Sequence, residues 1–248
     1  MADNSLNKIL LIDIGNSSIL CVEYLSDKDG CFENKISKRK KLKTSKFKTI
    51  FQYYNFEKYQ KIIVSSVVPK LDRYLKKHKN VLFINYKTIP LIKVNLEKNE
   101  QVGADRVVNA LAAWHIYKKS CLIIDSGTAL TFCYIDKKGV YQGGSIFPGM
   151  KISSAALNLY TAKIPLIQVT PIDHLCGKTT KEAVQIGLYY GYISLINGLI
   201  ENYKKMDPDI ITIGTGNGIN ILQDKLNIDE INKDLILKGL SICAKEQK

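Results

Sequence analysis

A chain of 248 residues in which 46% of the side chains are hydrophobic can fill the cores of one large or two medium domains. No stretch approaches the ~20 apolar residues of a membrane-spanning helix, and the N-terminus does not read as a signal peptide, so we expect a cytoplasmic protein with no membrane partner. The six cysteines form no CxxC pair, which argues against a zinc site or a disulfide framework and is typical of small buried residues in a reducing compartment.

The formal net charge of +13 would attract polyanions in general. Its densest part is residues 35–48, which read KISKRKKLKTSKFK. No zinc finger, helix-turn-helix or aromatic RNA-binding motif accompanies this segment. We therefore interpret it as a solvated surface of a lysine-rich protein, and we do not expect nucleic acid to be a partner. The charge would modestly favour an anionic substrate such as ATP.

In the first half of the chain, strands are predicted at 8–14, 19–24, 61–65 and 81–85, with helices at 47–59 and 69–77. The second of these helices has a proline at its start, which suits a first helical position. A further helix is predicted at 105–117, because its apolar residues recur at helical spacing. Asp105 falls in its first turn, where the helix dipole favours an anion.

The second half repeats this alternation. Strands are predicted at 121–125, 130–135, 140–143 and 210–213, with helices from Met150 onward, at 180–203 and at 234–245. The glycine-rich segment 143–149 is interpreted as a turn that leads into a helix. No linker rich in proline, glycine or serine separates the halves. We therefore predict two α/β half-domains, residues 1–117 and 118–248, that pack intimately around a cleft.

One short design occurs twice: residues 9–17 read ILLIDIGNS and residues 122–128 read LIIDSGT. Each copy is an apolar strand that ends on an aspartate, Asp13 or Asp125, and continues into a glycine turn with a hydroxyl-bearing residue after it. Such a strand directs a carboxylate out of its C-terminal end, and glycine lets backbone amides approach a phosphate. A single copy would be interpreted as a capped hairpin turn, but two copies favour phosphoryl transfer.

The paired turns resemble the phosphate loops of the acetate kinase, sugar kinase, Hsp70 and actin superfamily, which implies two ribonuclease H-like half-domains with ATP bound in the cleft. Five motifs follow the order seen in type III pantothenate kinases: DIGNSS at 13–18, GADR at 103–106, DSGTALTF at 125–132, GGSIFPGM at 143–150 and GKTTKEAVQIG at 177–187. The chain is identified as a member of that family. The resemblance implies ATP-dependent phosphorylation of pantothenate to 4′-phosphopantothenate, the first step of coenzyme A biosynthesis.

For the nucleotide, the resemblance implies contacts from Thr128 of the second loop and from six residues of the first: Asp13, Ile14, Gly15, Asn16, Ser17 and Ser18. It also implies that Asp125 helps to hold a monovalent cation, K⁺ or NH₄⁺. A hard cation of this kind prefers oxygen ligands, which a carboxylate supplies. Mg²⁺ would arrive with ATP and neutralise phosphate charge during transfer.

For pantothenate, the resemblance implies that Asp105 removes the proton of the accepting hydroxyl and that Gly103, Ala104, Asp105 and Arg106 bind the substrate. Arg106 could pair with the pantothenate carboxylate. The alternatives are a first-turn helix acid for Asp105 and a local salt bridge for Arg106. Thr180 corresponds to a threonine that reaches pantothenate across a homodimer interface, and a helix N-cap explains it equally well.

Among the positions that depart from the family pattern, two bear on ligand binding. Leu96 stands where a tyrosine usually lines the pantothenate site, through either a register shift or the loss of a polar contact. In the turn GTGNG at 214–218, Asn217 replaces an expected glycine, which bears on nucleotide affinity.

Two other functions remain open. Another small-molecule or sugar kinase of the superfamily would explain the two glycine loops. It would not explain why GADR occurs together with DSGT, because that combination is not a general signature of sugar kinases. A non-catalytic accessory factor for transcription would fit the basic surface, although intact Asp13, Asp105, Arg106 and Asp125 argue against it.

Overall fold

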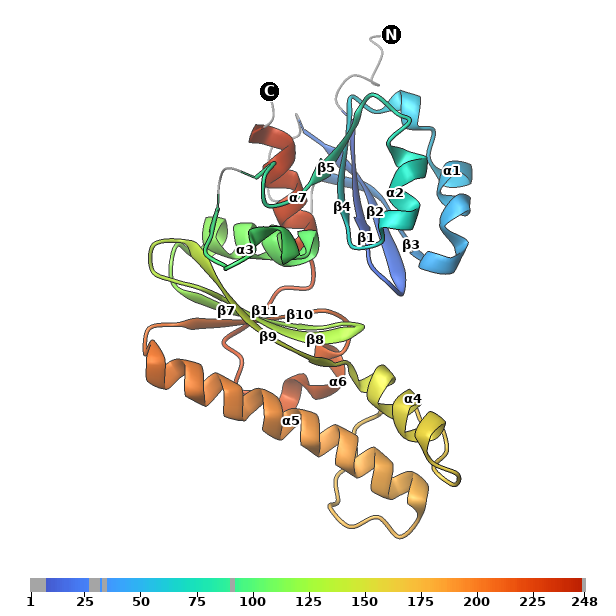
Figure 1. Ribbon diagram of the computed structural model, residues 1–248, viewed down its shortest axis with the longest axis vertical. Coiled ribbons are helices and arrows are strands. Elements are labelled where there is room, and N and C mark those ends of the chain that lie inside the picture. Colours follow the sequence, from blue (N-terminus) through green and yellow to red (C-terminus); the bar gives the residue numbers. More distant parts are fainter. Residues whose placement is uncertain (1–7, 27–31, 33–34, 90–91, 247–248) are drawn as a thin grey trace. The chain divides into compact units, whose positions relative to one another are not determined.

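The computed structural model describes residues 8–26, 32, 35–89 and 92–246, which form two compact units (Figure 1). The first unit contains the residues up to Ile116 together with the closing segment from Asp234, and the second contains Tyr117–Lys233. The sequence predicted a single boundary after residue 117. The structure has a second boundary before Asp234, because the closing helix packs on the sheet of the first unit.

The first unit is built on a mixed sheet in the order β3-β2-β1-β4-β5. Its strands are β1 (Lys8–Ile14), β2 (Ser18–Leu25), β3 (Ile36–Lys43), β4 (Lys61–Ser66) and β5 (Val81–Ile84). Strands β1, β2 and β3 are joined antiparallel, while β1–β4 and β4–β5 are parallel pairs. The central strands have near-continuous apolar sequences, because both faces of this sheet are covered.

Helices lie on both faces of the first sheet, with α1 (Ile50–Tyr53) and α2 (Pro69–Leu75) on one side and α7 (Leu235–Glu246) on the other (Figure 1). Alternate β1 residues face the first side, where they share a core with Phe47, Ile50 and Leu75. Helix α7 packs against β1 and β4. It also meets α3 (Ala104–Tyr117) so closely that a Cβ atom on Gly239 would lie 2.3 Å from the Val108 carbonyl oxygen.

In residues 35–59 one strand was not predicted and one predicted helix was wrong, although the exposed lysines of the segment agree with the predicted solvated surface. The lysine-rich segment contains β3, an edge strand whose charged side chains discourage pairing with another chain. The predicted helix at 47–59 is a series of three short pieces: the 3₁₀ helix η2 (Thr44–Thr49), α1 and the 3₁₀ helix η3 (Phe56–Lys58). Tyr54 is extended and Asn55 caps η3 with its side chain, so the helical hydrogen-bond ladder is broken there.

The second unit repeats the strand order of the first: in the same direction, its strands lie in the order β9-β8-β7-β10-β11. Its strands are β7 (Cys121–Ser126), β8 (Ala129–Ile135), β9 (Val140–Pro148), β10 (Ile211–Thr215) and β11 (Glu230–Ile231). The pairs β7–β8 and β8–β9 are antiparallel, and β7–β10 and β10–β11 are parallel. This repetition confirms the predicted fold class, an α/β chain with two ribonuclease H-like half-domains.

Strand β9 is longer than predicted, because GGSIFP continues the strand and does not form a turn. Gly144 makes this pairing fit, since a Cβ atom there would lie 1.7 Å from the Phe132 carbonyl oxygen of β8. Short elements β6 (Lys93–Val94) and η4 (Asn99–Gln101) precede α3.

The remaining helices of the second unit are α4 (Met150–Tyr160), α5 (Thr180–Met206), α6 (Ile219–Leu222) and the 3₁₀ helix η5 (Gln223–Lys225). Helix α5 covers one face of the sheet, where Ile196 and Ile200 share a core with Leu122, Ile124 and Leu130. Within the described ranges, α5 is the one helix long and apolar enough to cross a membrane by length and composition. Its buried side packs on the sheet as that of a core helix does.

Candidate active site

The first predicted loop is the hairpin turn between β1 and β2. Asp13 lies one residue before the end of β1, in register with Ser65 on β4. The turn closes through the Gly15 amide, which donates to the Ser18 carbonyl oxygen at 3.0 Å. Asn16 is exposed at the tip of this turn. The turn therefore offers an accessible apex beside a strand-end carboxylate, as a phosphate loop requires.

A residue that the sequence did not single out holds this turn. Thr44, at the start of η2, donates its hydroxyl to the Gly15 carbonyl oxygen at 2.7 Å and its amide to the Ser17 carbonyl oxygen at 3.2 Å. The signal was obscured because Thr44 lies inside the lysine-rich run, and β3, which carries it to the turn, was not predicted.

The second predicted loop is the turn between β7 and β8. Asp125 lies one residue before the end of β7, in register with Thr215 on β10. The Gly127 amide donates to the Ala129 carbonyl oxygen at 2.9 Å, and Thr128 is exposed. Each unit thus presents an aspartate and a hydroxyl-bearing turn at the same position of its sheet.

Glycines of two other segments press against the second loop. The Gly149 amide donates to the Thr128 carbonyl oxygen at 3.1 Å. Gly216 has a φ of 81°, and a Cβ atom there would lie 2.4 Å from Oδ1 of Asp125. Sequence reasoning noted the turn at 214–218 but not its contact with this carboxylate. Only a residue without a side chain fits so close to Asp125.

The GADR segment forms the start of α3. The amide of Arg106 donates to Oδ1 of Asp105 at 2.8 Å. A Cβ atom on Gly103 would lie 2.5 Å from the same oxygen, so glycine at this position leaves room for the carboxylate. Burial raises the pKa of Asp105 above its ordinary value, although the Arg106 amide and guanidinium oppose the rise. Arg106 also donates a guanidinium hydrogen bond to the Gln101 carbonyl oxygen at 3.4 Å.

The structure brings GADR and the first loop to one end of the first sheet. Val67 connects them: its amide donates to the Ile14 carbonyl oxygen at 3.0 Å, and its Cγ1 would lie 3.5 Å from a Cβ atom on Gly103. Asp13 and Asp105 are therefore contributed by neighbouring segments. The carboxyl ends of parallel strands are where open α/β sheets bind their ligands.

The N-cap interpretation of Thr180 was wrong. Thr179 is the N-cap of α5, and its hydroxyl accepts a hydrogen bond from the Glu182 amide at 3.2 Å. The Glu182 carboxylate accepts a hydrogen bond at 2.8 Å from the amide of Lys178, the residue before the N-cap, in an arrangement similar to a capping box. Thr180 is the next residue and is exposed. Its side chain is therefore not required to cap the helix.

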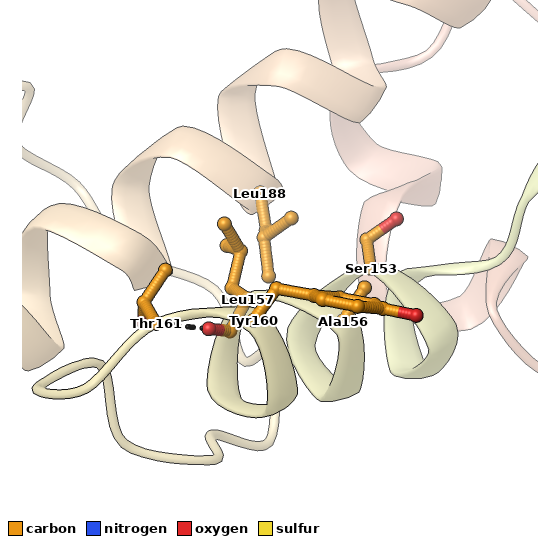
Figure 2. Close-up of a pocket in the computed structure, with 6 residues that line it drawn as sticks. All are labelled: Ser153, Ala156, Leu157, Tyr160, Thr161 and Leu188. Carbon is orange, nitrogen blue, oxygen red and sulfur yellow. Dashed lines mark hydrogen bonds between the residues drawn. The ribbon is translucent and has the colours of Figure 1, made fainter.

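A surface cavity of ≈ 470 Å³ lies on α4 and α5 of the second unit (Figure 2). Leu188 faces the α4 side chains Leu157 and Tyr160 there, and the remaining lining residues are Ser153, Ala156 and Thr161. None of the predicted site residues lines this cavity. Among the described residues, no group of three or more His, Cys, Asp or Glu could hold a metal ion.

Residues 9–202 match the sequence model of the type III pantothenate kinases. A curated relative from Citrifermentans bemidjiense, named type III pantothenate kinase, is 33% identical over 97% of this chain and 100% of its own length. One of the same name from Exiguobacterium sp. is 34% identical over 94% of this chain and 97% of its own length.

Solved structures show the same fold at lower sequence identity. A Campylobacter jejuni protein provisionally described as a Baf family transcriptional activator is 21% identical, with a TM-score of 0.63 over 96% of this chain and 98% of that chain. An inorganic polyphosphate/ATP-glucomannokinase from Arthrobacter sp. is 13% identical, with a TM-score of 0.51 over 97% of this chain and 99% of that chain.

Proposed function

This chain belongs to the type III pantothenate kinase family and phosphorylates pantothenate with ATP, and we propose that Asp105 is the base that removes the proton of the accepting hydroxyl. The product is 4′-phosphopantothenate, and the reaction is the first step of coenzyme A biosynthesis. The environment of Asp105 carries the assignment. Burial raises the pKa of this carboxylate, and a raised pKa makes it a better acceptor for the proton of an alcohol.

In the proposed reaction, the primary hydroxyl oxygen of pantothenate forms a bond to the γ-phosphorus of ATP while its proton passes to Asp105. The bond between that phosphorus and the β–γ bridging oxygen breaks, and ADP leaves with the electron pair. The enzyme's contribution is positioning and charge neutralisation. The Arg106 amide, 2.8 Å from Oδ1, holds the Asp105 carboxylate in one orientation for this step.

ATP is proposed to bind through the two glycine turns. In the first, Asp13, Ile14, Gly15, Asn16, Ser17 and Ser18 surround the phosphates, and in the second Thr128 contacts them. The exposed apex at Asn16 and the exposed Thr128 support this assignment, because a ligand can reach both. Backbone amides of a turn are suited to phosphate oxygens.

The kinase family uses ATP with a divalent metal, and we assign Mg²⁺ to that role. A monovalent cation, K⁺ or NH₄⁺, is assigned to Asp125. The residues present fit such an ion, because Asp125 supplies a carboxylate at a strand end and Gly216 leaves its Oδ1 side unobstructed by a Cβ atom. The ion would supply positive charge beside the phosphates.

Pantothenate is proposed to lie against Gly103, Ala104, Asp105 and Arg106, with its carboxylate paired to the Arg106 guanidinium. Thr180 is assigned to the pantothenate site of a partner subunit in a homodimer. The dimer is supported by exposed apolar side chains on and after α4, since Leu159, Tyr160 and Leu175 are 74%, 83% and 69% exposed. We also assign the protein to the cytoplasm, where both substrates of this reaction are present.

The reaction is tested by mass spectrometry of phosphopantothenate formed with ATP, Mg²⁺ and K⁺. The variants are Asp105→Asn, which keeps the size of the side chain, and Asp224→Asn as a matched exposed control. We expect wild-type rates for the control and a loss of about 10²–10⁴-fold for Asp105→Asn. Equal rates for all three proteins would contradict the role of Asp105. No product from folded wild type would contradict the kinase assignment itself.

The dimer has its own measurement, light scattering of the eluted protein. We expect twice the mass of one chain for wild type and a monomer for Tyr160→Glu, which places a charge on the exposed apolar surface. A monomeric wild type would contradict both the dimer and the assignment of Thr180 to a partner's site.

A further inference from the structure

The end of β3 lies against the first phosphate turn. Ser18 on β2 pairs in register with Lys43, the last residue of β3, so the following residue, Thr44, arrives beside the turn. Thr44 makes two hydrogen bonds there, from its hydroxyl to the Gly15 carbonyl oxygen at 2.7 Å and from its amide to the Ser17 carbonyl oxygen at 3.2 Å. Both donors of one residue are thus directed at a single turn.

Protein donors hold four carbonyl groups in and next to this turn. Besides the two bonds from Thr44, the Val67 amide donates to the Ile14 carbonyl oxygen and the Gly15 amide donates to the Ser18 carbonyl oxygen, each at 3.0 Å. A carbonyl oxygen repels a phosphate, whereas an amide hydrogen attracts it. Fixing the carbonyls in these bonds therefore keeps them from rotating toward an anion at the apex.

Gly15 is the position where such a constraint matters most. Glycine has no side chain to restrict its backbone, so the peptide that follows it can rotate more readily than any other in the turn. The Thr44 hydroxyl bonds to the carbonyl oxygen of that peptide. Because this contact is partly buried, solvent competes with it less than at an exposed site.

We propose that Thr44 is a positioning residue for ATP: it holds the turn 15–18 in the conformation that presents amide and hydroxyl groups to the phosphates. This proposal rests on the proposed function of the turn. It also gives a role to part of the lysine-rich segment, because exposed Lys43 and Lys46 flank Thr44 and add positive charge beside the turn. Positive charge of this kind raises the local concentration of a polyanion.

The test compares Thr44→Val, which keeps the shape of the side chain and removes the hydroxyl, with Thr44→Ser, which keeps the hydroxyl. Thr49→Val is the matched control, because the Thr49 hydroxyl also donates to a backbone carbonyl in the same segment, that of Lys46 at 2.8 Å, which is not part of the turn 15–18. Thr44→Ala is a second variant in case valine does not fit. The measurements are KM for ATP, KM for pantothenate, kcat, and the affinity for MgATP by calorimetry.

We expect Thr44→Val and Thr44→Ala to raise KM for ATP and the calorimetric Kd for MgATP by about 3–10-fold, the change that follows from loss of one net hydrogen bond. KM for pantothenate should stay within twofold, and Thr44→Ser and Thr49→Val should resemble wild type. An unchanged Kd for MgATP in both Thr44→Val and Thr44→Ala would overturn the proposal. So would equal losses for both substrates, or a serine variant as weak as valine.

The calorimetric measurement separates this proposal from the assigned reaction. If wild type makes no phosphopantothenate but Thr44→Val still weakens MgATP binding, the kinase assignment fails and the role of Thr44 stands. If wild type is active and Thr44→Val binds MgATP normally, only the role of Thr44 fails.

Discussion

In both units the residue after the third strand makes hydrogen bonds to the turn between the first two strands, but the two units use different residues for this contact. In each, the end of the third strand reaches the turn between the first two strands. In the first unit Ser18 pairs with Lys43 and Thr44 follows, whereas in the second Ala129 pairs with Pro148 and Gly149 follows. Thr44 holds its turn with a hydroxyl and an amide, but Gly149 uses its amide alone.

The contact that Gly149 makes in the second unit leaves no room for a side chain. A Cβ atom on Gly149 would lie 2.3 Å from the Thr128 carbonyl oxygen and 2.6 Å from that of Gly127. The strand end is thus closer to the turn in this unit, and a backbone amide can replace a hydroxyl. The fold fixes which segments meet, while the distance between them decides which residue can make the contact.

The largest expected effect on stability comes from adding a side chain at Gly149. Gly149→Ala forces the second turn and the strand end apart, and we expect a loss of about 2–4 kcal/mol in the free energy of unfolding, measured by urea denaturation. Gly187→Ala is the matched control, because a Cβ atom there meets nothing within 4 Å and lies in the helix α5. That substitution should stabilise the protein by about 0.5–1 kcal/mol. Similar losses for the two variants would show that the contact is unimportant.

A second contrast concerns the strand-end aspartates. Asp13 and Asp125 pair in register with Ser65 and Thr215. Among the glycines that the structure describes, one of positive φ, Gly216, lies against the carboxylate of Asp125, and none lies against that of Asp13. Gly216→Ala should therefore cost about 1–3 kcal/mol through backbone strain and displace that carboxylate.

The displacement is measured by titrating kinase activity with K⁺. We expect a higher half-saturating K⁺ concentration for Gly216→Ala than for wild type and for a Gly191→Ala control, whose Cβ atom would meet nothing within 4 Å. Identical titrations would contradict the assignment of the monovalent cation to Asp125.

The smallest expected effects on stability come from two carboxylates: Asp105, which is assigned to the reaction, and Asp136, which stabilises a turn. Burial raises the pKa of Asp105 in the first unit. Burial also opposes the charge of Asp136 in the second, but hydrogen bonds from the Val140 amide, the Gln142 side chain and the Lys138 amide hold the pKa of Asp136 below its ordinary value. Asp105→Asn and Asp136→Asn should therefore change the free energy of unfolding in opposite directions.

For Asp105, the native state binds a proton more readily than the unfolded chain, so this group's contribution to stability is lost as pH rises through its raised pKa. Asp105→Asn should be more stable than wild type at pH 7, by no more than about 1 kcal/mol, and the difference should shrink toward pH 3. For Asp136, the stabilisation of the native state is present above the ordinary pKa of the carboxyl group. It is lost as pH falls through the lowered pKa of the folded state. Asp136→Asn should be less stable at pH 7, again with a shrinking difference in acid. Thermal unfolding across this pH range checks both signs.

Much of this fold could be predicted from local sequence patterns. Strand β1 begins and ends where predicted, and Asp105 lies in the first turn of its helix. These elements have near-continuous or periodic apolar residues, so burial determines them. Strand β3 could not be predicted, because an edge strand carries lysines for solubility and has few apolar residues to mark it.

Other features depend on contacts between distant segments. The predicted helix at 47–59 is broken at Tyr54, which is buried in the core by tertiary packing. The contacts of Gly149 and Gly216 with the second loop join segments whose separation in sequence carries no signal of proximity. Thr44 was missed for the same reason, since its role depends on where β3 ends.

The return of the closing helix to the first unit has a consequence for biosynthesis. Leu235, Leu237 and Leu240 are fully buried in α7, which covers β1 and β4 and is translated after the whole of the second unit. The second unit, by contrast, is complete once Lys233 has emerged. Because domains fold as units during synthesis, the first unit becomes complete only after the second. Until α7 has emerged, the apolar sheet face that it covers stays exposed.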